Sequence, residues 1–176
     1  MSAFFPLARW LAARLPATIH PMILHFPIAL LYLCSCLEVL ALALPQEDGF
    51  LHRAAFWTIT LACVAIIVTM AAGLVSEQSV HWTPAMRAVL SRHQHFAVLT
   101  GLCAGAAWLL HVANRFPRSR RWGLWGRGRA SWLSAGFVLA SAVFVTLTAH
   151  LGGDMVYHYG AGVVGVTRTA PGGHAG

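Results

Sequence analysis

Four long apolar runs constrain this chain more than any other feature of its sequence. They cover about residues 22–44, 54–75, 95–113 and 130–151, and each is nearly free of charged side chains. About 20 such residues, wound as an α-helix, cross the roughly 30 Å hydrocarbon layer of a bilayer. Only 10% of the chain is charged, against about 25% in typical soluble domains. The sequence therefore predicts an all-α, integral membrane four-helix bundle over residues 19–166, in contact with the lipid bilayer.

Two short segments flank this predicted transmembrane domain. Residues 1–18 mix apolar side chains with Arg9, Trp10 and Arg14. This composition predicts a short amphipathic helix that lies in the membrane interface rather than a cleaved signal peptide. At the other end, residues 167–176 are small and polar, and we expect a flexible tail.

The arginines indicate how the chain is oriented in the membrane. The net charge is +7 and all 12 basic residues are arginines. Most lie between the apolar runs, which favours a role in membrane orientation over a nucleic-acid surface. Six of them fall within residues 115–129, and with Arg53 they outnumber the five on the opposite side. We therefore expect a multi-pass protein of the bacterial inner membrane, with this loop cytoplasmic and both termini periplasmic.

Histidines near the ends of the runs are the main candidates for a functional site, because ionisable residues at membrane depth are costly and usually functional. In a four-span topology, the starts of the first and third runs and the end of the fourth lie at one level, the outer one. Six histidines are expected there: His25, His95, His150, His93, His20 and His158.

His93 and His95 compete for the place on the third helix. They are two residues apart, about 200° around an α-helix, so only one can face the interior of the bundle. We favour His95 because it lies deeper in the span.

Imidazoles from two helices are a usual axial pair for b-type haem, and neutral imidazole also binds zinc and copper. We expect His25 with His95 or His150 to bind haem iron or another metal. Asp154 and Arg92 would lie beside that site and influence the reduction potential. No CxxCH motif for covalent haem is present.

Other cofactors and activities find less support in the sequence. Cys34 and Cys36 point about 200° apart on a helix, so they cannot both bind one copper ion. The chain contains no GxxxxGK[ST], HExxH or GxSxG motif. We therefore expect no catalytic activity of its own.

Glu38 is the only acidic residue within an apolar run. It belongs to the opposite, inner level of the bundle, together with His52 and His111. We expect a structural ion pair there, with Arg53 or His52 as the partner of Glu38. A second, inner site is the less favoured alternative.

Two motifs resemble a bacterial membrane family called domain of unknown function 2231. Residues 19–31, IHPMILHFPIALL, resemble its IHPxLVHFPIALL signature, and the sequence from His150 to Val163 resembles its closing HLGGxLVYxHGVGV motif. His95 resembles the histidine that opens the third helix of the family, and Glu38 stands where the family tends to place an acidic residue. The chain departs from the closing motif at Tyr159, where the family has histidine.

The resemblance implies a four-helix integral membrane protein of a family sometimes joined to Rieske or cytochrome c domains. Cytochrome c, Rieske or quinone-linked proteins are then the expected redox partners. The sequence as a whole predicts an electron-transfer subunit that binds b-type haem at the outer end of the bundle. The alternative is a non-redox scaffold, or a carrier of metal ions or protons, that uses the same histidines.

Overall fold

The computed structural model describes residues 19–44, 49–78, 80, 82–115 and 127–161. These residues are almost entirely helical and contain no β-strand. The helices are α2 (Ile19–Ile23), α3 (His25–Ala43), α4 (Phe50–Glu77), α5 (Pro84–Arg115) and α6 (Arg127–Tyr157). The predicted all-α class is confirmed. The predicted interfacial segment, residues 1–18, and the predicted tail, residues 167–176, lie outside the described residues.

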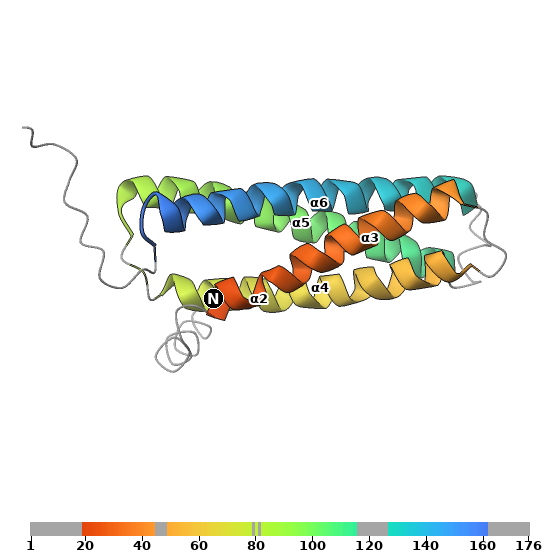
Figure 1. Ribbon diagram of the computed structural model, residues 1–176, viewed down its shortest axis with the longest axis horizontal. Helices are drawn as coiled ribbons and strands as arrows, with labels where there is room; N and C mark the ends of the chain where they lie inside the picture. The colour runs from red at the N-terminus through yellow and green to blue at the C-terminus, as the bar shows by residue number, and fades with distance from the viewer. Residues whose placement is uncertain (1–18, 45–48, 79, 81, 116–126, 162–176) are drawn as a thin grey trace, which may run out of the picture.

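The long helices form a bundle in which each helix packs against its neighbours in sequence (Figure 1). Contacts run from α3 to α4, from α4 to α5 and from α5 to α6, and contacts between α3 and α6 close the ring. α2 lies against α4. We call the end with α2 and the last turns of α6 the outer end, and the opposite end the inner end, after the predicted orientation.

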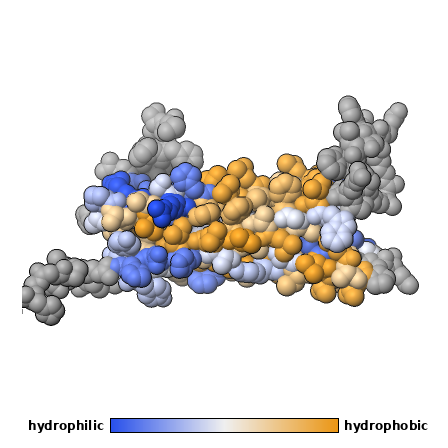
Figure 2. All heavy atoms as spheres, turned by 90° about the horizontal axis from the view of Figure 1, so that it is seen from above, coloured by the Kyte–Doolittle hydropathy of each residue, from blue (hydrophilic) through white to orange (hydrophobic). Residues whose placement is uncertain are grey.

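Large apolar side chains cover the outside of this bundle, and small ones fill much of its inside. Exposed residues include Phe26, Trp57, Ile67, Leu102 and Val143. Figure 2 shows apolar residues along most of one face, with hydrophilic residues gathered toward the outer end. Buried residues include Ala55, Ala62, Ala104, Ala107, Ser134 and Ser141.

This distribution is typical of a bundle dissolved in lipid, where close packing of small residues holds helices together. Within the part of the chain that the structure describes, four helical segments are long and apolar enough to cross a membrane: His20–Ala43, Phe50–Glu77, Pro84–Arg115 and Ser131–Tyr157. The chain is therefore a membrane protein with four apolar spans.

The first span is interrupted near Pro27. Proline has no N–H group and cannot donate to the carbonyl of Ile23, four residues earlier. α2 ends at Ile23, the backbone N–H of Leu24 donates to the carbonyl of His20 at 3.0 Å, and α3 begins at His25. The break lets α2 pack on α4 while α3 crosses to α6 (Figure 1).

The third span begins earlier than its apolar run. Its predicted start was about residue 95, but α5 runs without interruption from Pro84 to Arg115. Proline suits the first position of a helix because its missing N–H would have no partner there. The hydroxyl of Thr83 accepts a hydrogen bond from the N–H of Met86 at 3.3 Å and caps this end.

The fourth span also extends past its apolar run. α6 continues through Gly152 and Gly153 to Tyr157. It ends before Gly160, whose φ of 68° lies in the left-handed region that glycine adopts readily.

Candidate functional site

The histidines that were expected to share one site are exposed on three different helices. His25 is on α3, His95 on α5 and His150 on α6. His158 is also exposed, and its Nδ1 lies 3.2 Å from Oδ1 of Asp154. Among the described residues, no group of three or more histidines, cysteines or acidic residues is placed to hold a metal ion.

His93, and not His95, turns toward the neighbouring helix. His93 is half-buried, and its Nδ1 lies 2.9 Å from the carbonyl oxygen of Thr148 on α6. His95 is exposed, and its Nδ1 bonds to the carbonyl of Ser91 in its own helix at 2.7 Å. The preference for His95 was wrong because depth in the apolar run does not fix the rotation of a helix. The rotation of α5 is fixed by the face that packs on α6.

His20 on α2 is held by the same kind of hydrogen bond. Its Nδ1 lies 3.0 Å from the carbonyl oxygen of Thr69 on α4. The ring centroids of His20 and His93 are 6.4 Å apart, with an angle of 75° between the ring planes. The structure therefore brings together two histidines at the outer end, both from the predicted set, in a pairing that the sequence did not single out.

Two glycines let these rings lie close to the neighbouring backbones. A Cβ atom at Gly73 of α4 would stand 3.2 Å from both Cε1 and Nδ1 of His20. A Cβ atom at Gly152 of α6 would stand 3.5 Å from Cε1 of His93. The contact at Gly73 is the tighter of the two, so this position tolerates a side chain less well.

The hydrogen bonds fix the tautomer of both imidazoles. A carbonyl oxygen only accepts hydrogen bonds, so each Nδ1 carries a proton and donates it. In a neutral ring the remaining nitrogen, Nε2, then has a free lone pair. Metal-binding histidines usually donate their other N–H in this way, which orients the ring and makes it more basic. In both His20 and His93, Nε2 is therefore the nitrogen that is free to accept a hydrogen bond or to bind another group.

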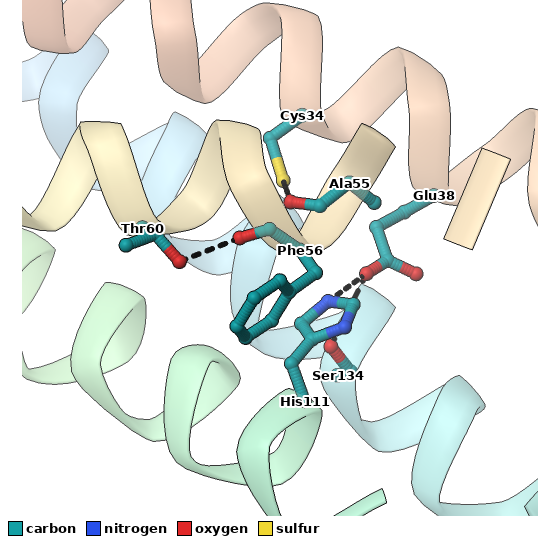
Figure 3. A network of polar contacts seen from close by, with 7 residues as sticks. All are labelled: Cys34, Glu38, Ala55, Phe56, Thr60, His111 and Ser134. Carbon is teal, nitrogen blue, oxygen red and sulfur yellow. Dashed lines mark hydrogen bonds and ion pairs between the residues drawn. The ribbon is translucent and has the colours of Figure 1, made fainter. Parts of the chain in front are cut away.

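A second polar cluster lies at the inner end, inside the bundle (Figure 3). Nε2 of His111 on α5 lies 2.5 Å from Oε1 of Glu38 on α3, and the hydroxyl of Ser134 on α6 donates to the same oxygen at 3.2 Å. Glu38 is only 1% exposed, and its other oxygen, Oε2, is buried without a hydrogen-bond partner.

The expected partner of Glu38 was Arg53 or His52, and the structure corrects this. Both of those residues are exposed near the start of α4. α3 and α5 have no direct backbone contact, and their side chains Glu38 and His111 meet between them. Sequence reasoning placed His111 at the right level, but it could not place it on the same side as Glu38.

An aromatic ring and a cation adjoin this cluster. The ring centroid of Phe56 is 6.3 Å from that of His111, and the guanidinium carbon of Arg115 lies 5.0 Å from the centroid of Phe56. Nearby, the indole N–H of Trp108 donates to the hydroxyl of Thr60 at 3.1 Å, which ties α5 to α4. His111 is therefore covered by Phe56, with a positive charge beyond it.

Comparison with known proteins identifies one relationship. The sequence model of a family described as "Predicted membrane protein (DUF2231)" matches residues 16–165. No curated protein and no solved structure matches the chain. The matched region contains both the outer histidine pair and the inner cluster.

Proposed function

This chain belongs to the DUF2231 family of predicted membrane proteins, and we propose that it is an electron-transfer subunit that binds b-type haem through His20 and His93. The observation that carries this proposal is the pair of imidazoles held by their Nδ1 atoms with ring centroids 6.4 Å apart. Its setting would be the bacterial inner membrane, with the pair on the periplasmic side.

The separation of the two rings supports a shared metal centre. Metal–nitrogen bonds to imidazole are about 2 Å long, so two imidazoles on opposite sides of one ion have ring centroids roughly 6 Å apart. The observed 6.4 Å agrees with this distance.

The number of ligands favours haem over a bare ion. Structural zinc sites use about four protein ligands and catalytic ones about three. The described residues offer no cluster of three or more such side chains. Haem brings its own four nitrogen ligands, so it would need only two imidazoles from the protein, and His20 and His93 would hold it.

Each neighbouring group has a role in this proposal. The carbonyls of Thr69 and Thr148 hold the two rings in orientation. Arg92, exposed and next to His93 on α5, offers a positive charge for propionate groups. Bound haem supplies a one-electron couple. Its potential would depend on nearby charge, including Arg92 and Asp154. Cytochrome c, Rieske or quinone-linked proteins are the proposed partners.

An optical spectrum of the purified protein tests the proposal. The protein is produced with a haem precursor, isolated in detergent, and measured oxidised and then reduced with dithionite. We expect a sharp reduced α-band and a shifted Soret band. His20→Ala and His93→Ala should each lose most of the bound haem, whereas the exposed-residue controls His25→Ala, His95→Ala and His150→Ala should keep it.

Each other outcome has a defined meaning. A colourless wild-type protein would overturn the haem proposal, and bound metal detected by elemental analysis would then support the carrier alternative. Loss of haem in His25→Ala, with haem retained in His20→Ala, would move the site to the exposed histidines.

A further inference from the structure

We propose that Glu38, His111 and Ser134 form a proton-exchange site, in which Glu38 takes up and releases a proton through His111. This site lies at the inner end of the bundle and is separate from the proposed haem ligands at the outer end. The inference rests on the burial of Glu38, the unequal surroundings of its two oxygens, and the exposure of His111.

The two carboxyl oxygens of Glu38 differ in their hydrogen bonds. Oε1 is within hydrogen-bond distance of both His111 and Ser134, while Oε2 is buried and has no partner. A permanently charged carboxylate accepts hydrogen bonds at both oxygens, and leaving one buried oxygen without a donor is costly. A protonated carboxyl group carries no charge and avoids most of this cost. The site is therefore built to accommodate the neutral acid as well as the carboxylate.

His111 provides the route for the proton. Its side chain is 10% exposed, against 1% for Glu38, and His111 lies about one turn before Arg115, where α5 ends at the inner end of the bundle. A proton from water binds to Nδ1 of neutral His111. The Nε2–H bond then breaks as an O–H bond forms at Oε1 of Glu38, which leaves His111 neutral with its proton on Nδ1. One proton enters the site, and release follows the same steps in reverse.

Transfer of the proton from Nε2 of His111 to Oε1 of Glu38 costs little free energy. Once one proton has entered, the pair is neutral overall, whether it is an imidazolium with a carboxylate or an imidazole with an acid. The transfer between Nε2 and Oε1 therefore leaves the net charge in the low-dielectric interior unchanged.

The groups that face the pair from the surrounding helices are a thiol, a hydroxyl, an aromatic ring and, beyond that ring, one guanidinium. Cys34 lies on α3 one turn before Glu38, and its thiol points to the carbonyl of Ala55 at 3.7 Å. On the α5 and α4 side, the guanidinium of Arg115 stands over Phe56, which borders His111. On α6, Ser134 is uncharged.

Infrared difference spectroscopy tests the proposal on the full-length protein in lipid vesicles. Spectra at acidic and alkaline pH reveal the carbonyl stretch of any carboxyl group that gains a proton. The chain has only five acidic residues, so single replacements can assign the band. We expect a band that shifts in heavy water, disappears in Glu38→Gln and persists in the controls Glu77→Gln and Asp154→Asn.

Two further variants separate proton exchange from a purely structural role. Ser134→Ala keeps both ionisable groups and should shift the frequency of the same band, since it removes one hydrogen bond to Glu38. His111→Gln should slow hydrogen–deuterium exchange of the carboxyl proton several-fold. The proposal is overturned if the difference spectra of Glu38→Gln and wild type agree, or if neither Ser134→Ala nor His111→Gln alters the band. The measurement does not involve the outer histidines, so its result is independent of haem binding.

Discussion

The imidazoles of His20 and His93 meet across the outer end of the bundle, with ring centroids 6.4 Å apart, although α2 and α5 make no direct backbone contact. Each ring is tied by Nδ1 to the carbonyl of a different helix, α4 for His20 and α6 for His93. The pair thus joins four helical segments. Residues that are far apart in the chain are thereby brought side by side.

Gly73 and Gly152 provide a matched pair of substitutions under the two rings. An added Cβ would stand 3.2 Å from His20 at Gly73 but 3.5 Å from His93 at Gly152. Replacing glycine with alanine within a helix stabilises it by about 0.5–1 kcal/mol where space allows. We expect Gly152→Ala to raise the unfolding temperature through this gain. Gly73→Ala should not raise it, because the added Cβ displaces His20. Equal unfolding temperatures for both variants would contradict the close contact at Gly73.

The Glu38–His111 pair should be costly to break but not to replace as a whole. Removal of one partner from a buried pair costs about 3–5 kcal/mol, while exchange of both for apolar residues of similar size is often neutral. We expect His111→Leu to destabilise the bundle strongly and the double variant Glu38→Met/His111→Leu to recover most of that loss. Unfolding in mixed detergent micelles measures both. Simple additivity of the two substitutions would show that the side chains are not coupled.

Two buried serines should differ in their contribution to stability. The hydroxyl of Ser134 donates to a carboxyl oxygen on another helix, whereas Ser35 donates to the carbonyl of Leu31 in its own helix at 2.8 Å. We expect Ser134→Ala to lower the free energy of unfolding by about 1–2 kcal/mol, as for a hydrogen bond to a charged group. Ser35→Ala should have a smaller effect, and a loss as large as that of Ser134→Ala would disagree with this assignment.

The proposed orientation can be tested at the two ends of α4. Phe50 and Gln78 are both exposed, at the inner and outer ends respectively. A membrane-impermeant maleimide should label Gln78→Cys in intact spheroplasts, and Phe50→Cys only after the membrane is opened. The wild-type protein is the control, because its four cysteines all lie within the apolar spans. Labelling in the reverse order would place the outer end in the cytoplasm.

The sequence predicted much of the architecture because the bilayer acts on single segments. The spans follow from runs of apolar residues, and the break near His25 follows from the missing N–H of Pro27. The end of the bundle at which each site residue lies follows from the alternating direction of successive spans. Both His20 and His93 were expected at the outer end and Glu38 at the inner end, and the structure confirms those levels.

Other features of the site could not be predicted in this way. Nothing in the sequence indicated that Gly73 and Gly152 lie under the two histidines, because these contacts join different helices. His111 was placed at the level of Glu38 but not recognised as its partner, for the same reason.

The sequence by itself therefore determined the number of spans, their approximate positions, and the end of the bundle at which Glu38 and the outer histidines lie. Only the tertiary structure decided which side chains face one another: His93 rather than His95, and His111 rather than His52 or Arg53. The physical reason is that each helix is apolar on nearly every side, and the lipid and the protein interior are equally apolar surroundings. Apolar side chains therefore do not determine which face of a helix turns inward. The rotation of each helix is then set by the close packing of small residues and by a few interhelical hydrogen bonds.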